Sequence, residues 1–207
     1  MDRRKRIIEE KKLVSFFRFD SQELTMKTVE AVLKGGISIL EITLTTPGAF
    51  EILQELRKNE NIILGAGTVL NMEDAQKVAD IGVDLIISPH TDENIIKFCS
   101  DARIVVFPGA GTPTEIYRAW SLGADYVKIF PAYTLGGPAF IKAVLGPFPF
   151  LKMYPTNGIT ADNFNEYLDA GAKAVGLAFG GADPKFVHEG NFEAVTECVK
   201  KVVETVS

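Results

Sequence analysis

The length, composition and charge of the chain are those of one folded domain. Its 207 residues are 46% hydrophobic and 24% charged, which excludes a disordered or collagen-like chain and allows a sizeable core. Lys and Arg number 22 against 27 Asp and Glu, and the net charge of −5 disfavours binding to nucleic acid or an anionic membrane surface. We therefore expect one domain over residues 1–207, in which an anionic ligand would need a locally basic pocket.

The cysteines and the N-terminal segment indicate the compartment. Cys99 and Cys198 are far apart and in no CxxC spacing, so neither a disulfide framework nor a cysteine zinc site is indicated. The apolar run from Leu13 is too short for a signal-peptide core, and no stretch approaches the ~20 apolar residues that span a bilayer. These features predict a cytoplasmic protein with no membrane partner. The basic run at residues 3–6, closely followed by acidic residues, predicts a solvated N-terminal helix.

Short apolar runs alternate with segments of helical spacing along the chain. The predicted strands are Val14–Arg18, Ile39–Thr43, Ile62–Gly67, Leu85–Ser88, Val105–Gly109, Tyr126–Phe130, Lys152–Thr156 and Ala174–Ala178. The predicted helices between them are Glu23–Leu33, Glu51–Lys58, Met72–Asp80, Asp92–Cys99, Pro113–Ser121 and Asn163–Ala170. Alternation of this kind predicts a parallel sheet with helical crossovers.

A recurring glycine divides the chain into similar pairs of units. Gly36, Gly82, Gly123 and Gly171 each end a helix and lead into the second, fourth, sixth or eighth strand. Glycine there adopts the left-handed conformation that ends a helix at little cost. The repeat predicts an α/β fold, namely a single compact (β/α)8 TIM barrel with an N-terminal helix. An open doubly wound sheet is the alternative, and the absence of GxGxxG after the first strand disfavours it.

Charged residues inside two predicted strands are the first candidates for catalysis. Lys128 lies among apolar neighbours in Tyr126–Phe130, where loss of hydration favours a neutral, nucleophilic amine. Glu41 is the natural base, and alternation places it on the same strand face as Thr43. Two simpler interpretations stay open: the lysine reaches out to solvent, or the glutamate only neutralises a buried cation.

An ionised Glu41 and a nucleophilic Lys128 are in conflict. An ionised glutamate beside a lysine favours the ammonium, which is not a nucleophile. Either desolvation outweighs this pairing, or Glu41 is protonated at rest, or water separates the two groups. A lysine and a glutamate on different strands of one barrel nevertheless indicate Schiff-base chemistry in which the carboxyl group moves protons. The two histidines, His90 and His188, form no metal-ligand pattern, so a zinc-dependent reaction is disfavoured.

Six motifs, taken together, resemble one enzyme family. They are Leu40-Glu41-Ile42-Thr43, Gly65-Ala66-Gly67-Thr68-Val69-Leu70, Ile87-Ser88-Pro89, Phe107-Pro108-Gly109, Val127-Lys128-Ile129-Phe130-Pro131-Ala132 and Pro155-Thr156-Asn157-Gly158-Ile159. In order and spacing they are similar to the bacterial 2-keto-3-deoxy-6-phosphogluconate (KDPG) and 4-hydroxy-2-oxoglutarate (KHG) aldolases. The resemblance implies a class I aldolase on a (β/α)8 barrel, usually a homotrimer, that uses no metal or other cofactor. It would cleave KDPG or KHG to pyruvate and an aldehyde, either glyceraldehyde 3-phosphate or glyoxylate.

The resemblance also implies roles for individual residues. Lys128 would form the covalent imine and Glu41 would be the general acid and base. The implied substrate-binding residues are Thr68, Thr156, Arg18, Pro89, Phe130, Thr45 and Gly158. The threonines at 68 and 156 are expected at the pyruvyl carboxylate, and the proline and phenylalanine at the wall against pyruvate. The arginine is expected at an anionic end of the substrate, which its planar guanidinium suits.

Three departures from the family's pattern concern substrate choice. Thr45 stands where many members have an arginine, Asn157 interrupts the usual Pro-Thr-Gly-Gly turn, and Gly176-Leu177-Ala178 replaces Gly-Gly-Ser. We expect Leu177 to narrow the phosphate site, and a Gly-Gly pair at residues 180–181 to offer another anion nest. These departures leave open a related substrate such as 2-keto-3-deoxy-6-phosphogalactonate, or an unphosphorylated one. A phosphate-binding barrel isomerase or epimerase and a catalytically silent keto-acid binder are the alternatives.

Overall fold

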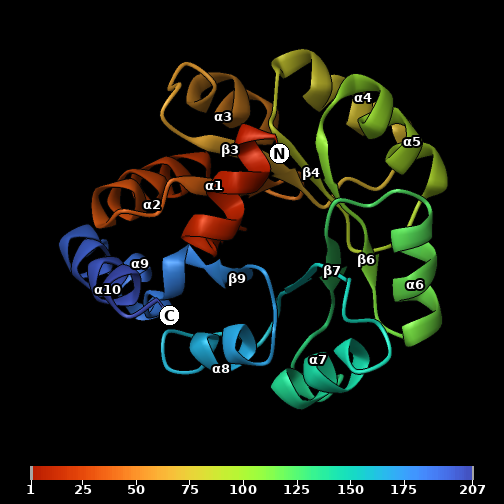
Figure 1. Ribbon diagram of the computed structural model, residues 1–207. Helices are drawn as coiled ribbons and strands as arrows, with labels where there is room; N and C mark the ends of the chain where they lie inside the picture. Colours follow the sequence, from red (N-terminus) through yellow and green to blue (C-terminus); the bar gives the residue numbers. More distant parts are fainter. Residues whose placement is uncertain (1, 207) are drawn as a thin grey trace.

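The computed structural model describes residues 2–206, in which strands and helices alternate as predicted (Figure 1). The strands are β1 (Leu13–Phe17), β2 (Ile39–Thr43), β3 (Ile63–Gly67), β4 (Leu85–Ile87), β5 (Val105–Phe107), β6 (Gly109–Ala110), β7 (Val127–Ile129), β8 (Met153–Pro155) and β9 (Val175–Ala178). The helices are α1 (Arg3–Lys11), α2 (Gln22–Gly35), α3 (Ala49–Leu56), α4 (Met72–Ile81), α5 (Glu93–Ala102), α6 (Pro113–Ser121), α7 (Gly137–Leu145), α8 (Phe164–Asp169), α9 (Pro184–His188) and α10 (Phe192–Glu204), with a 3₁₀ turn at Phe179–Gly181. Each predicted strand is confirmed, but the fifth is divided into β5 and β6.

All strand pairs are parallel, and they form two sheets. The strand orders are β5-β4-β3-β2-β1-β9 and β6-β7-β8. Pro108 separates β5 from β6, because proline has no N–H to continue a ladder. The backbone still passes directly from one sheet to the other there, and the N–H of Lys128 donates to the carbonyl of Pro108 at 2.8 Å. The barrel prediction is therefore met in part: within residues 2–206 the ladders form two parallel sheets rather than one continuous sheet of eight strands.

Strand alternation divides the hydrophobic core into two parts. Residues such as Leu40 and Ile42 face outward and pack in the larger core, together with apolar side chains of the helices. Residues such as Ile39 and Phe107 face inward and form a smaller second core. Figure 1 shows most helices arranged around the outside of the strands, with α1 lying across them. The inward faces of the strands are therefore where polar side chains from different strands can meet.

The helix ends follow the predicted glycines, whereas several helices were not predicted. Gly36, Gly82, Gly123 and Gly171 all have positive φ, between 87° and 108°, as expected of residues that end helices. Helices α7, α9 and α10 were missed. The first turns of α7 and α9 contain Gly or Pro, which are typical of loops. Both cysteines are free, as predicted. Within residues 2–206, no helix combines the length and apolarity needed to cross a membrane.

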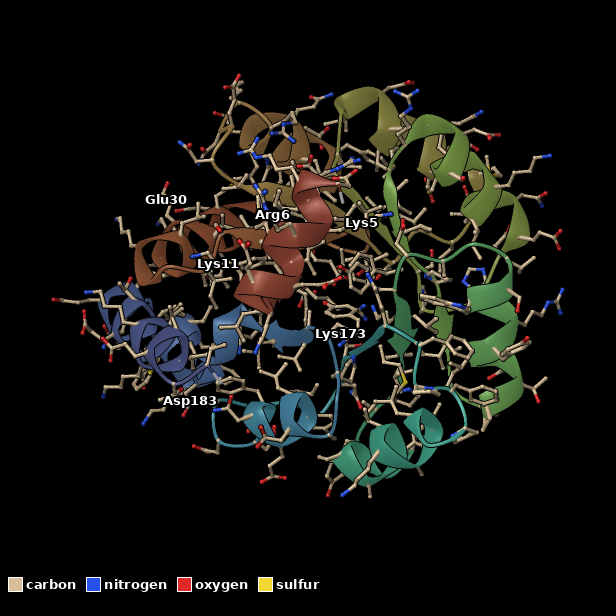
Figure 2. The ribbon with its side chains drawn as sticks, in the orientation of Figure 1. Lys5, Arg6, Lys11, Glu30, Lys173 and Asp183 are labelled. Atoms are coloured by element: carbon tan, nitrogen blue, oxygen red, sulfur yellow. The ribbon has the colours of Figure 1, made fainter. Side chains whose placement is uncertain are left out.

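Helix α1 covers the amino ends of the strands. Ile8 is fully buried in the inward core, and the carboxylate of Glu9 accepts hydrogen bonds from Lys152 Nζ at 2.8 Å and the Tyr126 hydroxyl at 3.1 Å. Lys5 forms an ion pair with Asp125, and Figure 2 shows Lys5 on the side of α1 that faces the strands. The prediction of a solvated helix is therefore wrong for its inner face, because these charges pair across the strand ends.

We expect Glu9→Gln to destabilise the fold at neutral pH but not in acid. The hydrogen bond from Lys152 holds the pKa of the Glu9 carboxyl below its ordinary value. The ionised group therefore stabilises the fold above the unfolded-state pKa, and this contribution is lost as pH falls through the folded-state pKa. Urea unfolding should show that the variant's free energy of unfolding is lower than the wild type's by roughly 0.5–1 kcal/mol at about pH 7. This difference should shrink toward zero at about pH 3. Glu10→Gln, at an exposed pair with Arg6, is the control, and an equal cost at both pH values would contradict the expectation.

Candidate active site

Strands β2 and β7 bring Glu41 and Lys128 together on the inward side of the sheets. Lys128 Nζ lies 3.6 Å from Glu41 Oε1, and the two side chains are only 9% and 2% exposed. Phe130 lies two residues beyond the lysine, and the centre of its ring is 5.7 Å from Nζ. The lysine and the glutamate, which were predicted on separate strands, therefore form one buried cluster.

A glycine on β3 leaves the space that the Glu41 side chain occupies. Strands β2 and β3 are paired so that Glu41 is beside Gly65, and Thr43 is beside Gly67. A Cβ atom on Gly67 would lie 2.1 Å from Glu41 Oε1 and 2.6 Å from its Cγ. Any other residue at position 67 would therefore displace the carboxylate.

Tyr154 is a member of this cluster that sequence reasoning missed. Its hydroxyl donates to Glu41 Oε2 at 3.2 Å. The register of β7 and β8 places it beside Lys128. Burial, and next the nearby carboxylate, raise the pKa of Tyr154 well above its ordinary value, so the phenol stays protonated and acts as a donor. One signal could have found it, since Tyr154 precedes Thr156 by two residues and so shares its strand face.

Arg18 and Thr68, both predicted to bind substrate, are in direct contact. Arg18 follows β1 and is exposed, and its Nη2 donates to Thr68 Oγ1 at 3.1 Å. Thr68 follows β3 and has a φ of 60°, a left-handed conformation that β-branched residues rarely adopt. Such backbone strain persists where the surrounding structure fixes the position of a side chain, often at functional sites.

The two other predicted threonines have different surroundings. The Thr45 hydroxyl lies 3.1 Å from that of Thr43, which donates to the carbonyl of Phe17 at 3.1 Å. Thr156 is buried, and its Oγ1 has no hydrogen-bond partner within the described residues. A buried hydroxyl without a partner costs free energy. Thr156 is therefore available to a polar ligand, whereas Thr45 belongs to a group of hydroxyls after β2.

The region predicted to bind phosphate differs from expectation at one residue. Gly158 has a φ of 75°, and a Cβ on it would lie 2.3 Å from Tyr133 Cβ, so the loops after β7 and β8 approach closely. Leu177 packs in the core on the helix side of the strands, while Gly176 faces Thr156. The expectation that Leu177 narrows this site is therefore wrong, because alternation along β9 points it away.

Pro89 and Phe130, predicted to form a wall, both line a cavity of about 440 Å³. His90, Gly109 and Arg118 also line it. A Cβ on Gly109 would lie 2.3 Å from the backbone carbon of Pro89, so only glycine fits there. Across residues 2–206, no three His, Cys, Asp or Glu side chains gather in a group that could hold a metal ion.

A buried lysine beside a carboxylate, on the inward faces of two parallel strands, is the arrangement of an enzyme active site. Residues 5–198 match the family model described as KDPG and KHG aldolase. The chain belongs to this family of aldolases.

Individual relatives agree with this assignment. The chain is 30% identical over 203 residues to the 2-dehydro-3-deoxy-phosphogluconate aldolase of Haemophilus influenzae, covering 96% of this chain and 94% of that one. It is 31% identical over 186 residues to the KHG/KDPG aldolase of Escherichia coli K12, covering 88% and 86%. A crystal structure of KDPG aldolase from Legionella pneumophila, with pyruvate captured as a covalent carbinolamine, superposes with a TM-score of 0.87 at 28% identity and covers 97% of this chain and 98% of that one. The prediction of an aldolase, and thus a lyase, is confirmed.

Proposed function

We propose that the protein cleaves KDPG, KHG or both to pyruvate and an aldehyde through a covalent imine on Lys128, without a metal or other cofactor. The observation that carries this proposal is the buried Lys128 amine, 3.6 Å from Glu41 Oε1. Family membership supports the reaction class. The carbinolamine captured in the Legionella aldolase supports a covalent route in this chain as well.

The reaction begins with addition of the neutral Lys128 amine to the C2 carbonyl of the substrate. A C–N bond forms, the carbonyl oxygen takes up a proton, and loss of water gives a protonated imine. Glu41, acting directly or through a water molecule, then removes the proton of the C4 hydroxyl. The electron pair of the C3–C4 bond moves toward the imine, which leaves an enamine on Lys128 and releases the aldehyde. Protonation at C3 and hydrolysis of the imine release pyruvate and restore the amine.

The remaining predicted residues would bind the substrate. The unpartnered hydroxyl of Thr156 supports a hydrogen bond to the pyruvyl carboxylate. Arg18 and Thr68, joined at 3.1 Å, would meet an anionic group at the entrance. Pro89 and Phe130 would contact the pyruvyl group. Thr45 and Gly158 would contact the substrate from the loops that follow β2 and β8.

We also propose a single domain over residues 1–207 in which the two sheets close into one (β/α)8 barrel. The hydrogen bond from Lys128 N–H to Pro108 supports closure at one junction. At the other junction, a Cβ on Gly176 of β9 would lie 2.5 Å from the Thr156 side chain after β8. A homotrimer with small-molecule keto acids and aldehydes as its ligands is proposed from the family resemblance.

Borohydride reduction tests this function. The protein is incubated with pyruvate and borohydride, digested and analysed by peptide mass spectrometry, while pyruvate release is assayed separately with KDPG and KHG. We expect one pyruvyl adduct, on Lys128, and release of pyruvate from one or both substrates. Absence of the adduct in folded protein that binds pyruvate would overturn the imine mechanism. Comparison of the two substrates decides between a phosphorylated and an unphosphorylated aldehyde product.

A further inference from the structure

We infer that Tyr154 is the positioning residue for Glu41, holding one carboxylate oxygen so that the other faces the Lys128 amine. The inference rests on the proposed function. The Tyr154 hydroxyl is 3.2 Å from Glu41 Oε2, and Lys128 Nζ is 3.6 Å from Glu41 Oε1. The two contacts therefore use different oxygens of one carboxylate, and together they fix its orientation.

The surroundings of Tyr154 fix the position of its hydroxyl. The side chain is fully buried, and its ring meets Phe107 edge-on, with ring centres 5.0 Å apart. On the other side, β9 presents Gly176, on which a Cβ would lie 2.6 Å from the tyrosine oxygen and 3.0 Å from its Cζ. The phenol thus fills a space that a glycine leaves open, and it reaches Glu41 from there.

The Tyr154 hydroxyl supplies the Glu41 carboxylate with a fixed hydrogen-bond donor. Because the buried phenol resists ionisation, it stays protonated and donates a hydrogen bond to the Glu41 carboxylate. A hydrogen bond donated to an ionised carboxylate stabilises that form over the protonated one. A base held in one orientation also loses less freedom on reaching the transition state. Tyr154 therefore acts on the reaction through Glu41, without contact to the substrate.

If Tyr154 only stabilised the core, removing its hydroxyl would have the same effect as removing that of Tyr126. Tyr126 is therefore the matched control. Its ring also packs on Phe107, with centres 4.7 Å apart, in the same inward core. Its hydroxyl, however, contacts Glu9 and the carbonyl of Lys5 at the far end of the strands. Tyr126→Phe thus removes an equivalent hydroxyl without touching Glu41.

The test compares Tyr154→Phe with Tyr126→Phe in cleavage kinetics. For Tyr154→Phe we expect kcat to fall about 10-fold with little change in KM, because one hydrogen bond to a charged group is lost. Borohydride should still trap pyruvate on Lys128. Tyr126→Phe should match the wild type in all of these.

A double-mutant cycle gives a readout that does not depend on stability. In a Glu41→Gln background, Tyr154→Phe should lower kcat by less than about 2-fold, because a positioning residue has no effect without the group it positions. An equal loss of kcat in both backgrounds, or a rise in KM in place of a fall in kcat, would overturn the inference. Equal effects of Tyr154→Phe and Tyr126→Phe would also overturn it. If borohydride traps no pyruvate on the wild-type protein, the proposed function is overturned instead. This measurement on the wild type is made before any variant is compared.

Discussion

Lys128→Ala is expected to abolish imine trapping and to lower kcat by about 10⁴-fold or more, because the nucleophile itself is removed. The substitution truncates a side chain that is 9% exposed, beside a carboxylate that then lacks its cation. Thermal unfolding should therefore be recorded for the same preparation. Cleavage of KDPG and KHG, and mass spectrometry after borohydride reduction with pyruvate, are the measurements.

Lys152→Met is the matched control for this prediction. Lys152 lies at the other end of the strands, where it pairs with Glu9 at 2.8 Å. Its replacement removes a cation that is partly buried, and it should leave trapping and kcat unchanged. A pyruvyl adduct on another lysine of the Lys128→Ala protein would contradict the assignment of the nucleophile.

Glu41→Gln is expected to lower kcat by about 10²–10⁴-fold while pyruvate is still captured on Lys128, at a reduced rate. Glutamine keeps the shape of the side chain and an oxygen that can accept the hydrogen bond from Tyr154. It cannot take a proton from the C4 hydroxyl. Single-turnover cleavage and the rate of borohydride trapping together separate the loss of proton transfer from a loss of imine formation.

Glu9→Gln serves as the control for this second prediction. Glu9, like Glu41, is a carboxylate that pairs with a lysine and a tyrosine hydroxyl, but it is only partly buried and lies at the amino ends of the strands. It should retain wild-type kcat. A loss of less than about 10-fold in Glu41→Gln would show that another group moves the proton.

The strands and their order along the chain could be predicted because each is a short, mostly apolar run. The division at Pro108 was visible in the sequence as a residue without an N–H, but its effect on the ladder depends on which strands lie beside it. Helix α10 has an amphipathic pattern, with Val195, Val199 and Val202 at helical spacing, but the element it packs against could not be predicted. Its place depends on Gly35 of α2, where a Cβ would lie 2.4 Å from Val199 Cβ.

The candidate site was predictable in its charged residues and not in their surroundings. Lys128 and Glu41 stand out because ionised side chains are rare within apolar strands. Tyr154 does not stand out, because a tyrosine in a strand is ordinary, and only the register of β7 and β8 reveals that it reaches the carboxylate. Leu177 was misjudged for a similar reason. Neighbouring residues of a strand point to opposite faces, so Gly176 points inward and Leu177 points outward.

Helix α1 covers one end of the inward core. Ile8 and the Glu9–Lys152 pair lie at that end, and Lys128 and Glu41 lie further along the strands, toward their carboxyl ends. In the proposed reaction, substrate, aldehyde and the hydrolytic water would therefore all enter and leave at the carboxyl ends of the strands. The bound aldehyde would keep bulk water from the enamine until it leaves, and pyruvate would leave last.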